Sequence, residues 1–179
     1  MDDLLRARLA AVRVLALDVD GVLTDGSLAY GPEGESLKVF HVRDGLGLRL
    51  VQSEGIAVAV ITAKRSPMLS RRLAELKVEH VLDGREDKGV ALVELAARLG
   101  VSLEQIAYAG DDVLDLPALR RAGVAIAVAD AHPRARAEAH WTTIERGGRG
   151  AVREICDALL SARGRLDAAC EALISGSGR

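Results

Sequence analysis

The stretch Val14-Leu-Ala-Leu-Asp-Val-Asp-Gly-Val-Leu-Thr-Asp25 indicates how this chain folds and where its chemistry lies. Its apolar first part predicts a buried strand, which ends abruptly in the carboxylates of Asp18 and Asp20. Because alternate side chains of a strand point the same way, these two would lie side by side, and Gly21 permits a turn directly after them. Neighbouring carboxylates raise one another's pKa unless a cation relieves them, and oxygen ligands suit Mg²⁺. The plain alternative is a turn after a strand, since Asp and Gly are common in turns.

Length and composition predict one domain with a sizeable core. The chain has 179 residues, and 24 Lys and Arg nearly balance 26 Asp and Glu. This balance and the scarcity of aromatic residues argue against nucleic-acid binding. No apolar run approaches the ~20 residues that span a bilayer, so we expect no membrane partner. The opening residues lack a secretory signal, and Cys156 and Cys170 lack metal-ligand spacing. We therefore expect a cytoplasmic protein with free thiols.

Apolar strands alternate with helical segments along the rest of the chain. Continuous apolar runs predict the later strands, at residues 56–61, 81–82, 106–109 and 124–129. This alternation predicts an α/β fold, a Rossmann-like three-layer structure whose parallel sheet is covered on both faces. We expect one domain over residues 1–163 and a partly flexible tail over 164–179.

A β-hairpin is predicted directly after the first strand, over about residues 26–42. Two short β-like runs flank the turn Gly31-Pro-Glu-Gly34 there. Apolar side chains fall on both faces of the hairpin, so we expect another subunit to cover it. Asp44 then has the residue type of a helix N-cap, which predicts a helix from this point to about Ser53.

Polar side chains follow three of the predicted strands at the points where the strands end. They are Asp18 and Asp20, then Thr62, then Asp111, Asp112 and Asp115. In open parallel sheets, ligands bind at the carboxyl ends of the strands. Each of these residues alone could belong to a turn, but together they predict a single site.

Four motifs follow one another in the chain: Asp18-Val-Asp-Gly-Val-Leu-Thr-Asp25, Thr62, Lys88 and Gly110-Asp-Asp-x-x-Asp115. In this order they resemble the motifs of haloacid dehalogenase-type phosphatases. Three longer segments resemble a capless branch of that family, namely residues 40–47, 127–133 and 147–154. That branch hydrolyses 3-deoxy-D-manno-octulosonate 8-phosphate (Kdo 8-phosphate) in lipopolysaccharide biosynthesis. The resemblance therefore implies a small phosphorylated sugar acid as substrate and no large cap domain.

In that branch a tetramer completes each active site, so the resemblance also implies a homotetramer, which we expect to form around the hairpins. The segment Arg165–Arg179 extends beyond the last predicted core helix. Our hypothesis is that this tail covers the active site of a neighbouring subunit.

The resemblance implies a role for each acidic residue. Asp18 would attack phosphorus and form an aspartyl-phosphate, while Asp20 would give a proton to the leaving alkoxide and take one from water. Mg²⁺ would be held by the Asp18 carboxylate, the Asp20 carbonyl and Asp111. Asp112 and Asp115 would orient the waters of the metal and Lys88, although Asp115 could also be a helix N-cap.

The resemblance also implies a set of phosphate and substrate contacts. The Thr62 hydroxyl, the Ala63 amide and the Lys88 ammonium would bind phosphate oxygens. Taken alone, Lys88 would be a solvated helix residue, because lysines are mostly exposed. Thr24 and Arg43 are further candidates for contact with the substrate.

One motif departs from the pattern of the branch. Where Thr/Ser-Gly-Arg is usual, this chain has Thr62-Ala-Lys64, followed by Arg65. Lysine keeps the positive charge but lacks the planar fork that binds a carboxylate, which Arg65 could supply instead. Two substrates therefore stay open, Kdo 8-phosphate and a nine-carbon keto sugar acid 9-phosphate of the Kdn or sialic acid type.

A different class of protein shares part of this pattern. Receiver domains of signalling proteins also bind Mg²⁺ beside a phospho-accepting Asp, with a Thr and a Lys nearby. In that class the acidic pair follows the first strand and the Lys follows the last. Here Asp111 and Asp112 come after Lys88, and Asp20 supplies an acid/base group. We therefore expect an enzyme and not a switching module.

Overall fold

A parallel sheet forms the centre of the computed structural model, which describes residues 2–176. Its six strands lie in the order β5-β4-β1-β6-β7-β8, and every neighbouring pair is parallel. They span Val14–Leu17 (β1), Ala57–Ile61 (β4), His80–Leu82 (β5), Ile106–Gly110 (β6), Val124–Ala127 (β7) and Trp141–Thr142 (β8). This sheet confirms the predicted α/β class and the positions of the predicted strands to within two residues.

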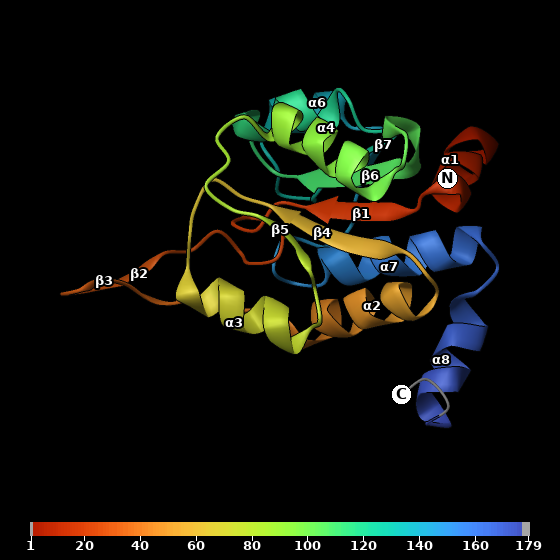
Figure 1. Cartoon of the computed structure of the whole chain (residues 1–179), viewed down its shortest axis with the longest axis horizontal. Helices are drawn as coiled ribbons and strands as arrows, with labels where there is room; N and C mark the ends of the chain where they lie inside the picture. The colour runs from red at the N-terminus through yellow and green to blue at the C-terminus, as the bar shows by residue number, and fades with distance from the viewer. Residues whose placement is uncertain (1, 177–179) are drawn as a thin grey trace.

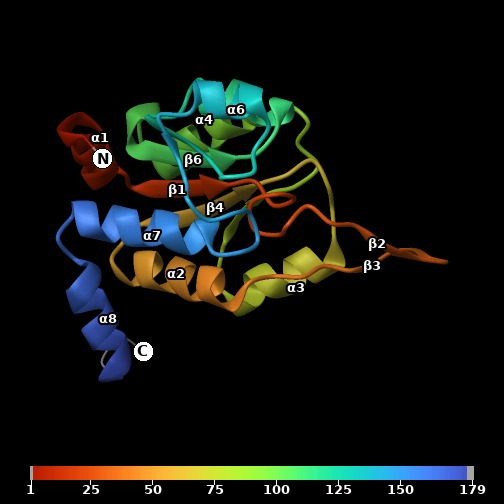
Figure 2. The ribbon, with the colours of Figure 1, turned by 180° about the vertical axis from the view of Figure 1, so that it is seen from behind.

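Helices cover both faces of the sheet, which gives three layers (Figure 1). Helices α4 and α6 lie on one face, and α2, α3 and α7 lie on the other, as the view from behind also shows (Figure 2). The helices span Asp3–Ala11 (α1), Val42–Ser53 (α2), Pro67–Glu75 (α3), Lys88–Leu99 (α4), Leu116–Leu119 (α5), Pro133–Glu138 (α6), Ala151–Ala162 (α7) and Leu166–Ile174 (α8). Because both faces are covered, all four residues of β1 are buried, as expected for a parallel sheet. Among residues 2–176, no helix combines the length and apolar character needed to cross a membrane.

The hairpin after β1 consists of β2 (Ala29–Gly31) and β3 (Gly34–Leu37), which pair antiparallel and project away from the sheet (Figure 1). It is shorter than predicted, because the chain after Leu37 leads into α2 instead of extending the strand to residue 42. No large cap domain is inserted there, as predicted.

The predicted start of α2 is wrong. The helix begins at Val42, with His41 at the N-cap, so Asp44 lies in its first turn. Asp44 caps a different helix, because its Oδ1 accepts a hydrogen bond of 2.8 Å from the backbone N–H of Arg153 in the first turn of α7. The N-cap of α7 is Gly150, which has no side chain to do this. Asp44 thus satisfies a free amide of a helix more than a hundred residues away.

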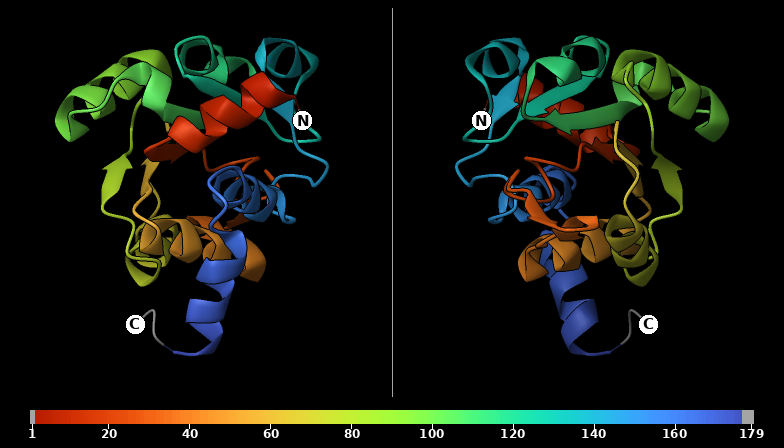
Figure 3. Two further views of the ribbon diagram at one scale, coloured as in Figure 1. Left: turned by 90° about the vertical axis from the view of Figure 1, so that its right-hand side faces the viewer. Right: turned by 90° about the vertical axis from the view of Figure 1, so that its left-hand side faces the viewer.

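The first part of the predicted tail folds as α8, which contacts α2 and α7 and extends away from the sheet (Figure 3). Arg165, just before α8, forms an ion pair of 2.7 Å with Glu54 after α2. The prediction that the tail frays at its end concerns partly residues 177–179, which lie outside the described residues.

Candidate active site

The central position of β1 brings the predicted residues together. This strand lies between β4 and β6, so the loops after all three strands meet at one edge of the sheet. The backbone N–H of Asp18 donates to the carbonyl of Ala109, which extends the pairing of β1 with β6 by one residue. The side chain of Asp18 is thereby fixed directly at the strand end, where the residue is only 6% exposed.

Lys88, the first residue of α4, points at this strand end. Its Nζ lies 2.8 Å from Oδ2 of Asp18 and 2.7 Å from Oδ1 of Asp115. The lysine is buried, and burial by itself lowers the pKa of an ammonium group, but the charges of the two carboxylates outweigh this and raise the pKa of Lys88. Lys88 is therefore a charged group of the site and not a solvated helix residue.

Asp115 holds the loop after β6 in place. Its Oδ1 accepts hydrogen bonds from Lys88 and from the hydroxyl of Tyr108, at 2.7 and 2.6 Å. Its Oδ2 accepts the backbone N–H groups of Asp111 and Asp112, at 2.9 and 3.0 Å. Both oxygens are thus fully occupied by donors, so the carboxylate of Asp115 orients its neighbours and has no lone pair free for a metal.

The remaining carboxylates fit a divalent cation. Asp18, Asp111 and Asp115 offer oxygens within 4.8 Å of one another, and of these Asp18 and Asp111 have coordination capacity left. Burial, together with the charges of Asp115 and Asp18, raises the pKa of Asp111 to about 8. Burial raises the pKa of Asp18 to about 6, although Lys88 acts in the opposite direction. A cation between these two carboxylates would stabilise their charged forms, which is the chemistry expected of an Mg²⁺ site.

Gly21 leaves the space that Asp111 needs. The glycine has φ +97°, and a Cβ at this position would overlap the carboxylate of Asp111. The Asp-x-Asp-Gly motif therefore places its glycine directly beneath a candidate metal ligand from another loop. Any side chain at residue 21 would displace Asp111 from Asp18.

Asp20 has partners that the sequence analysis missed. The Nζ of Lys38, which follows β3, donates to Oδ1 of Asp20 and lies 3.2 Å from Oε1 of Glu35. The Nζ of Lys64 lies 3.9 Å from Oδ2 of Asp20. A signal was available, because the chain contains only four lysines among 24 basic residues. Three of these four, Lys38, Lys64 and Lys88, contact an aspartate of the first motif.

Thr62 follows β4 and is buried beside the cluster. Its backbone N–H donates to the carbonyl of Leu82, and its carbonyl accepts from the N–H of Arg85. Its hydroxyl accepts a hydrogen bond of 3.2 Å from the N–H of Lys64. The same loop exposes Ala63 and Lys64 to solvent.

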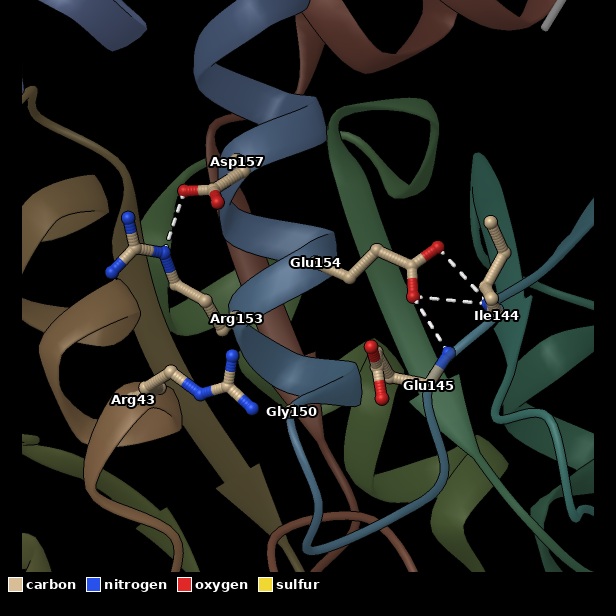
Figure 4. A pocket seen from close by; sticks show the side chains of 7 residues that line it. All are labelled: Arg43, Ile144, Glu145, Gly150, Arg153, Glu154 and Asp157. Carbon is tan, nitrogen blue, oxygen red and sulfur yellow. Dashed lines mark hydrogen bonds and ion pairs between the residues drawn. The ribbon is translucent and has the colours of Figure 1, made fainter.

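Within residues 2–176, the other predicted substrate contacts form no hydrogen bond or ion pair with an aspartate of the site. Thr24 is buried, and its hydroxyl is used within its own loop by Val19 and Gly26. Arg65 is exposed and lies 3.4 Å from Asp83. Arg43 lines a separate cavity of about 360 Å³ beside the start of α7 (Figure 4). No aspartate of the site lines that cavity, so contact of these residues with a substrate stays a prediction.

Comparison with known proteins identifies relatives over nearly the whole chain. The haloacid dehalogenase-like hydrolase family matches residues 78–155. The chain is 46% identical to the 3-deoxy-D-manno-octulosonate 8-phosphate phosphatase of Yersinia pestis over 166 residues, which cover 93% of this chain and 88% of the relative.

Solved structures of such phosphatases have the same fold. The enzyme of Moraxella catarrhalis, solved with magnesium, phosphate and Kdo, superposes with a TM-score of 0.92 at 41% identity, covering 94% of this chain and 97% of that one. The cobalt-bound enzyme of Haemophilus influenzae gives a TM-score of 0.87 at 42% identity, covering 89% and 93% of the two chains.

Proposed function

The chain belongs to the haloacid dehalogenase-like hydrolases, and from this membership we propose that it hydrolyses Kdo 8-phosphate to Kdo and inorganic phosphate in lipopolysaccharide biosynthesis. The observation that carries the proposal is the cluster of the buried Asp18 and Lys88 with the half-buried Asp111, where β1, α4 and β6 meet. It occurs in a chain 46% identical to a phosphatase with this substrate. The late position of the Asp111-Asp112 pair argues against a receiver-like signalling module.

Asp18 is the nucleophile in this proposal. Its carboxylate oxygen attacks phosphorus, the bond to the sugar oxygen breaks, and an aspartyl-phosphate forms. Lys88 lies within 2.8 Å of this carboxylate and brings positive charge to the phosphoryl oxygens. Asp115 fixes Lys88 through a bond of 2.7 Å, so the ammonium stays in place during the reaction.

Asp20 is the acid and then the base. It gives a proton to the alkoxide that leaves, and afterwards takes a proton from the water that attacks the phosphorus of the aspartyl-phosphate. That second attack releases phosphate and restores Asp18. In this proposal the Thr62 hydroxyl and the Ala63 amide, which follow β4, bind phosphoryl oxygens.

The cofactor of this enzyme is Mg²⁺. The carboxylates of Asp18 and Asp111, with the carbonyl of Asp20, would hold it, and it would offset the negative charge that the phosphate ester brings to Asp18. The donor set supports this assignment, because hard oxygen ligands favour Mg²⁺. The M. catarrhalis relative was solved with magnesium.

A substrate panel tests the activity. We expect phosphate release with Mg²⁺ to be faster by orders of magnitude from Kdo 8-phosphate than from a nine-carbon keto sugar acid 9-phosphate or p-nitrophenyl phosphate. Asp18→Asn should be inactive toward all three. A preference for the nine-carbon ester would show that this is the substrate, in keeping with the departure from the usual motif at Lys64. An absence of turnover for every ester would refute the phosphatase.

The assembly is a further part of the proposal. We propose a homotetramer built around the hairpins, in a reducing compartment such as the cytoplasm, where the two cysteines remain free thiols. The hairpin and its flanks expose large apolar side chains, Leu28, Tyr30, Leu37 and Val39, at 46–69%. Exposed apolar groups of this kind mark interaction sites. A monomer in light scattering would contradict the tetramer.

The tail hypothesis also stays a proposal. Helix α8 and the residues after it would cover the active site of a neighbouring subunit. Truncation after Ala162 should then change turnover or KM while the fold of residues 1–162 persists. Unchanged kinetics of the truncated chain would refute this role of the tail.

A further inference from the structure

We propose that Lys38 is a positioning residue for proton transfer, because its ammonium holds one oxygen of the Asp20 carboxylate and leaves the other facing the phosphate ester. The inference rests on the proposed function, in which Asp20 gives a proton to the leaving oxygen. Lys38 lies at the base of the hairpin, one residue after β3, and its Nζ donates to Oδ1 of Asp20.

The environment of Lys38 is that of a fixed internal cation. Its side chain is 2% exposed, although the hairpin itself extends away from the sheet. Burying an ammonium group is costly unless carboxylates pair with it. Here Asp20 and Glu35 both do so, the latter at 3.2 Å. The lysine is therefore held by protein groups and is shielded from solvent.

Asp20 is open on its other side. Its side chain is 22% exposed, and its Oδ2 lies 3.9 Å from the Nζ of Lys64, a side chain that is 48% exposed. That distance is too long for a hydrogen bond. Within residues 2–176, Lys38 is thus the side chain that hydrogen-bonds the Asp20 carboxylate. Oδ1 is engaged, and Oδ2 is the oxygen free to carry the proton.

This geometry predicts a dependence on the leaving group. A general acid works only when it lies within hydrogen-bond reach of the atom that receives the proton. The sugar alkoxide of Kdo 8-phosphate needs that proton in order to leave, whereas p-nitrophenolate leaves without one. Loss of Lys38 should therefore slow the alkyl ester far more than the aryl ester. A lysine that only supported the fold would slow both equally.

The experiment compares kcat/KM for the two esters in the full chain carrying Lys38→Met, at saturating Mg²⁺. This constant reports on the step that expels the leaving group, and the ratio of two values from one sample does not depend on the folded fraction. We expect the alkyl-to-aryl ratio of kcat/KM to fall about tenfold or more. A positioned general acid contributes about 10²–10⁴-fold in all, and loss of its positioning should remove part of that contribution. Lys38→Arg, which keeps the charge, should restore part of the ratio. Lys77→Met removes an exposed lysine away from the site and should leave the ratio unchanged.

A double variant identifies the group through which Lys38 acts. Asp20→Asn removes the acid and should lower the ratio further than Lys38→Met does. Adding Lys38→Met to Asp20→Asn should then change the ratio no more, because the two residues act as a unit. Equal losses for both esters in Lys38→Met, or a further tenfold loss in the double variant, would overturn the proposal. Failure of the proposed function is distinguishable, since the wild-type chain would then not hydrolyse Kdo 8-phosphate at all.

Discussion

Replacing Tyr108 by phenylalanine removes one hydroxyl from the centre of the site and leaves the packing of the ring unchanged. Tyr108 is completely buried, and its hydroxyl donates a hydrogen bond of 2.6 Å to Oδ1 of Asp115. A hydrogen bond to a charged group contributes about 1.5–3 kcal/mol. We therefore expect the free energy of unfolding to fall by about 1.5–3 kcal/mol in Tyr108→Phe.

Urea unfolding at fixed protein concentration and saturating Mg²⁺ measures this loss, with an unchanged m-value as the sign that only stability has changed. In a thermal scan the same loss corresponds to a decrease in Tm of about 3–12 °C for a chain of this length. Ser161→Ala is the control, because it also removes one hydroxyl, but from an exposed position of α7, and it should change stability by less than about 0.5 kcal/mol. If both variants have the same free energy of unfolding, the Tyr108 hydroxyl does not stabilise Asp115 as proposed.

Two further predictions follow from the acidic cluster and from its glycine-rich surroundings. In the metal-free protein the pKa values of Asp18 and Asp111, about 6 and about 8, lie above the ordinary value of 3.8. At a pH between the ordinary pKa of 3.8 and the raised pKa values, the native state binds protons that the unfolded state has lost. The free energy of unfolding therefore falls as the pH rises from 3.8 to about 8. Mg²⁺ binds the deprotonated carboxylates, so the increase in Tm that it causes should become larger up to about pH 8. An increase that does not depend on pH would contradict a metal site formed by Asp18 and Asp111. Gly147→Ala should destabilise the fold by about 1–3 kcal/mol in urea unfolding, because the added Cβ would overlap the carbonyl of Gly21. Gly31→Ala, which meets only ordinary contacts, should cost less, and equal losses would refute this packing.

The sheet and the main cluster could be predicted from the sequence because both depend on local patterns. Continuous apolar runs mark strands that are covered on both faces, and the ends of neighbouring parallel strands must meet. Asp18, Thr62 and Asp111 each follow such a run, so their loops converge whatever the helices between them do. The start of α3 is equally local, because Ser66 caps the helix through a bond to Leu69 within one turn and Pro67 occupies its first position.

The contacts that could not be predicted from the sequence depend on the tertiary structure and not on a local pattern. Lys38 reaches Asp20 only because of the path by which the hairpin returns to the sheet. Tyr108 lies in a strand of apolar residues, and its hydroxyl is significant only because Asp115 turns back toward it. Asp44 has the residue type of an N-cap for its own helix, but tertiary packing places it at the start of another helix. Residue type alone does not specify such partners.

The role of Asp18 as the nucleophile is tested most directly by identifying the residue that becomes phosphorylated. The chain would be mixed with Kdo 8-phosphate and Mg²⁺, quenched in acid within one turnover and mapped by peptide mass spectrometry. In a second sample, Asp20→Asn would be mixed with p-nitrophenyl phosphate, whose leaving group needs no proton, so that the intermediate forms but its hydrolysis is slow. With Asp18 as the nucleophile, we expect one phosphoryl group on the peptide that contains Asp18, absent in Asp18→Asn. Turnover of the ester with no phosphorylated peptide, or with the phosphoryl group on another residue, would contradict it.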